Sequence, residues 1–125
     1  MILIDTSVWI EYFKGNPQTK DIDKLIDQNN ICINNIILAE LRPILISRKQ
    51  DELNDLLLYL PIIPMNINWE EIIHMQCLNL DNGINKVGIP DLMILQNAIQ
   101  NKATIWTLDK HFMLMNKIIQ FELFS

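Results

Sequence analysis

Short apolar segments alternate with longer stretches of helical periodicity along the whole chain, and this alternation limits the fold more than any other feature. The short segments are separated by helical stretches rather than by tight hairpins. Strands that are joined through helices lie parallel in one sheet, with the helices packed against its faces. The sequence therefore predicts an α/β fold, a three-layer α/β/α sandwich with a mostly parallel central sheet.

The apolar patterns define the expected elements. The expected strands cover residues 2–4, 31–33, an edge segment between the prolines at 61 and 64, 103–106 and 117–121. The expected helices cover residues 8–13, 21–28, a helix from 36 capped by Asn34 or Asn35, 51–60, 69–80 and 90–101. Pro43 falls inside the third helix, where we expect it to kink the backbone or to end the first segment.

The bulk composition is that of one globular domain spanning residues 1–125. Half of the residues are hydrophobic and 20% are charged, and a chain of this length can bury a substantial core. No apolar run reaches the length of a membrane span, so we expect no membrane partner. The two cysteines form no disulfide framework, which favours a reducing, cytoplasmic compartment.

Two acids follow predicted strands. Asp5 comes directly after the strand at residues 2–4, and Asp109 comes shortly after the strand at residues 103–106. Parallel strands end at one edge of a sheet, and ligands of open α/β sheets bind beyond that edge. We therefore expect Asp5 and Asp109 to lie close together at the carboxyl edge.

Two further acids lie on the packed sides of predicted helices. Glu40 falls inside the apolar stripe of its helix, and Asp91 lies in a first turn, on the side of Ile94 and Leu95. The opposite side of that second helix carries Gln96, Asn97, Gln100 and Asn101. Because helices that follow strands begin at the carboxyl edge of the sheet, Asp91 is expected at the same rim as Asp5.

Each acid also has an ordinary structural interpretation. Asp5 and Asp109 are suited to capping the helical turns that follow them, and Asp91 is suited to complementing a helix dipole. Glu40 fits a partly buried acid paired with an arginine. Four independent coincidences at one edge are a weaker explanation than one shared site.

A cluster of four carboxylates predicts a cation. Two unit charges about 4 Å apart repel by about 4 kcal/mol at an effective dielectric constant near 20, so some acids must protonate or bind a cation. All-oxygen donors favour Mg²⁺, with Mn²⁺ as a substitute. Ser7 and Thr107 flank the acids, where we expect them to bind a metal-bound water or a phosphate oxygen.

The net charge of −5 argues at first against a partner made of nucleic acid. Without the four site acids, however, 11 acids remain against 10 lysines and arginines. Bound divalent ions would also reverse the local sign of the charge. The acidity of the chain is thus mainly a property of the predicted metal site.

Four segments in order resemble one family. The sequences MILIDTSVWI, IILAEL, IPDLMILQNA and TIWTLDKHF are similar to the motifs of PIN-domain ribonucleases, close to the VapC-type toxins of bacterial toxin–antitoxin pairs. The resemblance implies an Mg²⁺-dependent endoribonuclease, often a homodimer neutralised by an antitoxin. Its catalytic and metal-binding acids would be Asp5, Glu40, Asp91 and Asp109, supported by the hydroxyls of Ser7 and Thr107.

Other residues near these motifs have less specific interpretations. His111 stands where many relatives carry another acid, so we expect no fifth acidic ligand. Lys86 and Lys110 are suited to contacting a phosphate, although each is equally suited to a solvated surface. His74 and Cys77 share a helix without companion ligands, and because a zinc site needs three or four ligands we expect ordinary packing.

Two alternative functions stay open from the sequence. The first is a catalytically silent PIN-like module that binds RNA or a protein. The second is a phospho-accepting receiver-type domain, which has a similar length and acids at strand ends. Its acceptor aspartate should end the third strand, yet the segment PIIPMNIN contains no aspartate.

Overall fold

The structure is a computed structural model that describes all residues from 1 to 125. Its sheet has three parallel strands in the order β2-β1-β3. The strands are β1 (Ile2–Ile4), β2 (Ile31–Cys32) and β3 (Thr104–Trp106). Single parallel bridges, Ile33 to Ile62 and Ile105 to Leu123, continue the sheet at both edges.

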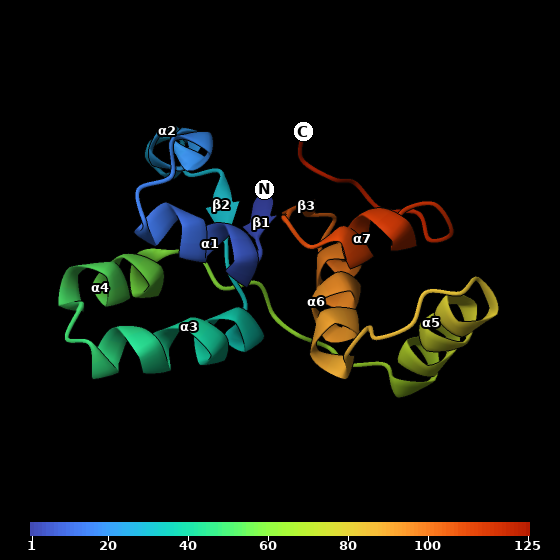
Figure 1. The fold of residues 1–125 in the computed structure, drawn as a ribbon. Coiled ribbons are helices and arrows are strands. Elements are labelled where there is room, and N and C mark those ends of the chain that lie inside the picture. The colour runs from blue at the N-terminus through green and yellow to red at the C-terminus, as the bar shows by residue number, and fades with distance from the viewer.

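Helices flank the sheet on both sides, as the sequence predicts. Helices α1 to α4 gather beside β2, and α5 to α7 gather beside β3 (Figure 1). The helical elements are α1 (Thr6–Phe13), the 3-10 turn η1 (Pro17–Thr19), α2 (Asp21–Asp27), α3 (Asn35–Ser47), α4 (Asp51–Tyr59), α5 (Trp69–Asp81), α6 (Ile89–Gln100) and α7 (Lys110–Met115). None of them combines the length and apolar character that a bilayer crossing requires.

The C-terminal segment differs from the prediction. Residues 117–121 form no strand, because the backbone N–H groups of Ile118 and Ile119 donate to the carbonyl of Met115 in a turn that closes α7. The contact with β3 comes later, at Leu123. Helix α7 itself was not predicted, since its six residues are too few for a clear helical period.

Pro43 does not end its helix, so that part of the prediction is wrong. Helix α3 continues through it to Ser47. A proline removes one backbone hydrogen bond, but Leu41 and Leu45 on either side of Pro43 are both buried in the core. Packing therefore maintains the helix. Of the two predicted caps, Asn34 is the N-cap, and its side chain accepts a hydrogen bond from the Ile37 N–H at 2.9 Å.

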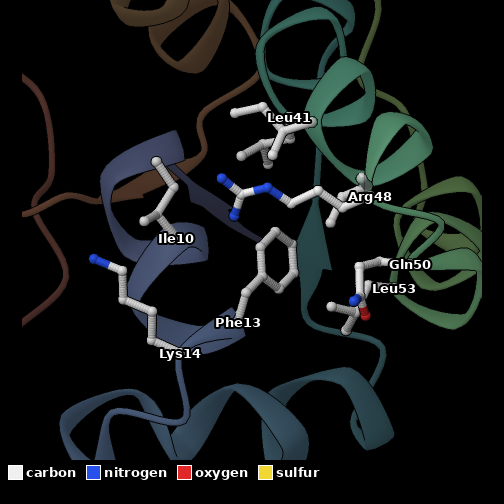
Figure 2. A pocket seen from close by; sticks show the side chains of 9 residues that line it. Ile10, Phe13, Lys14, Leu41, Arg48, Gln50 and Leu53 are labelled. Atoms are coloured by element: carbon white, nitrogen blue, oxygen red, sulfur yellow. The ribbon is translucent and has the colours of Figure 1, made fainter.

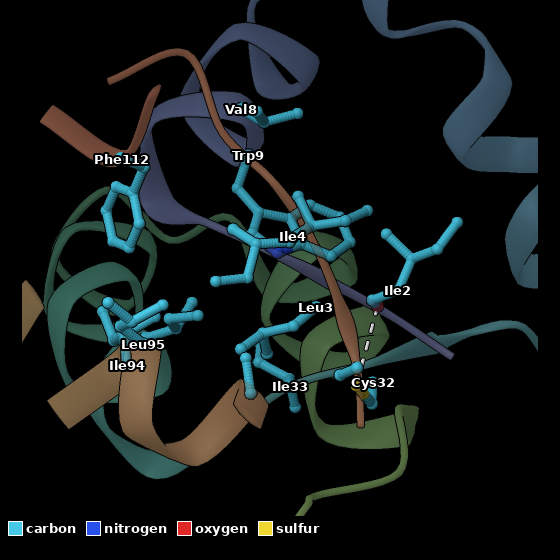
Figure 3. Close-up of a cluster of buried hydrophobic side chains, with 14 of the residues drawn as sticks. Ile2, Leu3, Ile4, Val8, Trp9, Cys32, Ile33, Ile94, Leu95 and Phe112 are labelled. Atoms are coloured by element: carbon cyan, nitrogen blue, oxygen red, sulfur yellow. Dashed lines mark hydrogen bonds between the residues drawn. The ribbon is translucent and has the colours of Figure 1, made fainter. Parts of the chain in front are cut away.

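The core fixes the end of β1. Leu3 and Ile4 are fully buried, and so are Trp9 of α1 and Phe112 of α7 (Figure 3). Close packing of this kind holds a backbone in one position. The backbone of Asp5, which follows Ile4, is therefore held in a fixed position.

Gln96 and Asn97, on the polar side of α6, are buried and hold the segment 61–68. Asn97 Nδ2 donates to the Pro64 carbonyl at 2.9 Å, and Asn34 Nδ2 donates to Asn97 Oδ1 at 3.0 Å. Gln96 accepts from the Asn68 N–H at 3.1 Å and donates to its carbonyl at 3.0 Å. We call Asn34, Pro64, Asn68, Gln96 and Asn97 the amide network. Because the segment 61–68 has only a single β-bridge, at Ile62, these side-chain hydrogen bonds hold it in place where a strand would be held by backbone hydrogen bonds.

Candidate functional site

Asp5 lies at the carboxyl end of β1 and is only 6% exposed. Its Oδ2 atom accepts two hydrogen bonds of 2.9 Å, from Ser7 Oγ and from Thr107 Oγ1. Although Asp5 occupies the N-cap position of α1, its side chain makes no capping hydrogen bond. The carboxylate is thus directed across the sheet edge rather than into the helix that follows it.

Ser7 and Thr107 join the ends of β1 and β3. Their hydroxyl oxygens lie 3.5 Å apart. Besides donating to Asp5, Ser7 Oγ accepts from the Leu108 N–H and Thr107 Oγ1 accepts from the Asp109 N–H, both at 3.0 Å. Both hydroxyl protons are therefore directed to Asp5, and the loop after β3 is held against the same carboxylate.

Glu40 projects from α3 toward α1. Thr6 Oγ1, in the first residue of α1, donates to Glu40 Oε1 at 3.1 Å. Partial burial raises the pKa of Glu40, the hydrogen bond from Thr6 lowers it, and the charges of Asp5 and Asp91 raise it further. The charges of two other predicted site acids therefore act on Glu40.

Asp91 lies in the first turn of α6 and is half-buried. Partial burial raises its pKa, and so do the charges of Asp109 and Asp5. A hydrogen bond with the backbone of Gly88 and the charge of His111 act in the opposite direction. Asp91 is thus the acid on which the charges of both strand-end aspartates act.

Asp109 caps α7, as its ordinary interpretation expects. Its Oδ1 atom accepts from the His111 N–H at 2.9 Å. The same oxygen lies 2.9 Å from His111 Nδ1, where a protonated imidazole forms an ion pair. His111 thus pairs with the last acid of the cluster.

Three of the four acids share one pattern. One oxygen is held by the protein, namely Asp5 Oδ2, Glu40 Oε1 and Asp109 Oδ1, and the other oxygen makes no hydrogen bond with protein. Oxygen donors of this type suit a hard divalent cation. No three acidic, histidine or cysteine side chains already enclose a metal position. The site therefore has the donor chemistry for Mg²⁺ without a preformed cage.

The two candidate phosphate contacts stand apart from this network. Lys86 is exposed in the loop before α6, and Lys110 is exposed at the start of α7. Neither lysine side chain makes a hydrogen bond or an ion pair with the protein. On α5, His74 and Cys77 are both exposed, so the prediction that they pack in the ordinary way is wrong. They belong to no group of metal ligands.

Sequence reasoning missed the role of Thr6. The hydroxyl next to Asp5 was visible, but its partner Glu40 is 34 residues away, and no spacing rule connects them. The pairing of His111 with Asp109 was also missed, although a histidine two residues after an N-cap aspartate is a local signal for it.

An apolar groove lies between α1, α3 and the start of α4 (Figure 2). It has a volume of about 410 Å³ and is lined by Ile10, Phe13, Lys14, Leu41, Ile44, Leu45, Arg48, Gln50 and Leu53. Figure 2 shows the Arg48 side chain reaching past the Phe13 ring. We call it the α1–α3 groove. The acids do not line it, although Leu41 follows Glu40 directly in α3.

Comparison with known proteins identifies related chains. A family model described as the PIN domain matches residues 2–117. A chain in the structure of VapBC2 from Rickettsia felis, solved with a DNA fragment from the VapBC2 promoter, is 24% identical with a TM-score of 0.75. That match covers 100% of this chain and 98% of the other. A search of curated proteins found no match.

Two further solved structures share the fold. A chain in the structure of VapBC-1 from nontypeable Haemophilus influenzae is 20% identical, with a TM-score of 0.70 and 98% of both chains covered. A chain in a toxin–antitoxin complex from Klebsiella pneumoniae is 20% identical, with a TM-score of 0.58 and 88% of both chains covered. At these identities the likeness concerns the fold.

Proposed function

The chain belongs to the PIN-domain family, and from this premise we propose that it is a metal-dependent endoribonuclease. The family membership removes the receiver-type alternative. In the proposed reaction, Asp5, Glu40, Asp91 and Asp109 bind the metal and catalyse hydrolysis of an RNA phosphodiester. The observation that carries the proposal is geometric: Ser7 and Thr107 join the ends of β1 and β3 around the Asp5 carboxylate and hold the Asp109 backbone beside it, while Thr6 draws Glu40 toward the same end of β1.

The electrostatics support a divalent cation. Partial burial raises the pKa of Glu40 and of Asp91. The charges of Asp5 and Asp91 add to this effect at Glu40, and the charges of Asp109 and Asp5 add to it at Asp91. The fold therefore holds like charges close together at a cost that a cation offsets. We propose Mg²⁺, with Mn²⁺ as a substitute, because every donor is a carboxylate oxygen.

The residues of the chain have separate roles in this mechanism. When bound, Mg²⁺ would polarise the scissile phosphate and lower the pKa of a water molecule. The free oxygens of Asp5, Glu40 and Asp109 would hold the ion. Ser7 and Thr107 keep the Asp5 carboxylate in one orientation, since they occupy its other oxygen. The products are a 5′-phosphate and a 3′-hydroxyl.

Lys86 and Lys110 are the proposed phosphate contacts. Both are exposed lysines without a protein partner, so both are free to bind a substrate. Replacing either one with alanine should weaken RNA binding. It should also reduce the slope of log affinity against log salt concentration by about 1, the value for one phosphate contact. Lys117→Ala, an exposed lysine beyond α7, is the matched control.

A cleavage assay tests the proposal. Wild-type protein should cut a structured RNA in Mg²⁺, and excess EDTA should stop it. Asp91→Asn should lower the rate by at least about 100-fold, whereas Asp55→Asn, an exposed acid on α4, should leave it unchanged. Cleavage that survives EDTA would rule out this chemistry. RNA binding without cleavage would instead favour the catalytically silent module.

We also propose that the protein is the toxin of a toxin–antitoxin pair and forms a homodimer. The related Klebsiella pneumoniae chain comes from a toxin–antitoxin complex. The α1–α3 groove supports a protein partner, because its apolar lining carries two cations, Lys14 and Arg48. That combination suits an amphipathic, acidic segment of an antitoxin.

Co-purification tests the proposed antitoxin surface. Ile44 lines the groove and is 48% exposed, whereas Ile46 lies on the same helix outside the groove and is 55% exposed. Ile44→Asp should abolish co-purification with the proposed antitoxin, while Ile46→Asp should retain it. Equal retention by both variants would place the antitoxin elsewhere. The molar mass of the isolated protein in solution tests the homodimer.

A further inference from the structure

We propose that Thr6 is a positioning residue, which holds the Glu40 carboxylate in the orientation that binds the divalent cation. The inference rests on the proposed function and adds a residue to it. Thr6 does not touch the metal in this proposal. It acts through the Glu40 side chain.

The hydrogen bond from Thr6 engages one oxygen of the Glu40 carboxylate and leaves the other oxygen free. Thr6 Oγ1 donates to Oε1 at 3.1 Å, and Oε2 makes no hydrogen bond with the protein. Glu40 is otherwise a long, solvent-facing side chain on α3, and such a side chain loses considerable rotamer freedom when it is fixed in place. A donor already in position reduces the ordering that metal binding requires. Partners of this kind around metal ligands are a general device.

Thr6 is itself held firmly. It is the first residue of α1, and the third and fourth residues of that helix, Val8 and Trp9, are completely buried. On either side of Thr6, the side chains of Asp5 and Ser7 are bonded to each other. The donor is thus part of the rigid end of β1, whereas the acceptor lies on a different helix.

Neighbouring hydroxyls serve different acids. Ser7 donates to Asp5 and Thr6 donates to Glu40. The sequence Asp5-Thr6-Ser7 therefore sets the position of two carboxylates from distant parts of the chain relative to each other. Removing the Thr6 hydroxyl should leave Asp5 in place and release only Glu40.

The chain contains a matched control for this hydrogen bond. Thr104 Oγ1 donates to Glu122 Oε2 at 3.3 Å, also between exposed partners. Thr104 begins β3, so it lies at the end of the strand away from the carboxyl edge. Loss of a threonine–glutamate bond as such should affect both positions equally, whereas loss of metal positioning should affect Thr6 alone.

The experiment compares Mn²⁺ binding with cleavage. Isothermal titration of the full chain with Mn²⁺ should give a Kd about tenfold higher for Thr6→Val than for wild type. Thr6→Ser, which keeps the hydroxyl, should restore the wild-type Kd, and Thr104→Val should match wild type. In cleavage assays, Thr6→Val should need about tenfold more Mg²⁺ for half-maximal rate, with kcat at saturating Mg²⁺ close to that of wild type.

The outcomes separate the two proposals. A wild-type protein that binds no Mn²⁺ and cuts no RNA would overturn both. A wild type that does both, with Thr6→Val unchanged, would overturn only the role of Thr6. A loss in Thr6→Ser as large as in Thr6→Val would also overturn it, because the hydroxyl would then be irrelevant. Thr6→Ala provides a second hydroxyl-free variant if Thr6→Val fails to fold.

Discussion

Two clusters of polar side chains include residues of helix α6. In one the side chains meet complementary hydrogen-bond partners, and in the other they carry like charges. In the amide network, the side chains of Asn97 and Gln96 meet partners of the complementary kind. In the acid cluster, made of Asp5, Glu40, Asp91 and Asp109, partial burial and then neighbouring like charges raise the pKa values of Asp91 and Glu40. Complementary partners are typical of a structural role, whereas carboxylates held near one another are typical of the binding site that we propose.

The largest expected effect on stability comes from the amide network. Asn97 is 1% exposed and bonds to both Asn34 and Pro64. Asn97→Ala leaves the buried Asn34 side-chain amide without its acceptor and removes one of the two side-chain donors to the Pro64 carbonyl. Because a buried polar group left unsatisfied costs about 1–3 kcal/mol, we expect the free energy of unfolding, measured by chemical denaturation, to fall by about 2 kcal/mol.

A neighbour on the same helix provides the control for Asn97. Asn101 also donates to the Pro64 carbonyl, at 3.3 Å, but its bond is exposed to solvent. Asn101→Ala should therefore cost less than about 1 kcal/mol. Equal losses for the two variants would mean that burial does not distinguish the amide network from surface hydrogen bonds.

The second-largest expected effect is stabilisation by Mg²⁺, which should depend on the acid cluster and not on the amide network. At a concentration of about ten times its Kd, Mg²⁺ should raise the free energy of unfolding of the wild type by about 1.4 kcal/mol. Asp91→Asn should lose this increment, whereas Asn97→Ala should keep it, because its site acids are intact. The measurement is denaturation with and without Mg²⁺. An undiminished increment in Asp91→Asn would remove Asp91 from the metal site.

The edge positions of Asp5 and Asp109 could be predicted from the sequence, whereas the amide network could not, for a physical reason. Asp5 and Asp109 follow strands, and strand direction alone brings them to one edge. Burial of Gln96 and Asn97 depends instead on the segment 61–68, whose backbone lacks a strand ladder. Helical periodicity assigned those amides to the side of α6 away from the acids but did not show that this side is covered.

Contacts between distant residues set the limit of the sequence prediction. The bounds of β1, β3, α4 and α6 follow closely from apolar spacing and local capping. The hydrogen bond between Thr6 and Glu40 depends on how α1 packs against α3. No local sequence pattern predicts how these two helices are placed relative to each other. The same limit explains why Pro43 does not end its helix, since tertiary packing outweighs a local preference.

The smallest effect is a pH dependence confined to the acid cluster. The pKa of Asp91 is raised above its ordinary value of 3.8, by partial burial and then by Asp109 and Asp5. The folded protein therefore takes up a proton at higher pH than the unfolded chain does. Without metal, the stability of wild type relative to Asp91→Asn should rise as the pH falls from about 7 toward the raised pKa.

Denaturation curves for both proteins at several pH values, in the presence of EDTA, measure this difference. The gain should be complete below the ordinary pKa, where folded and unfolded chains are both protonated. Partial solvent access keeps the effect below that of Mg²⁺. A relative stability that falls with decreasing pH would mean that attraction, not repulsion, dominates around Asp91, and the contrast with the amide network would fail.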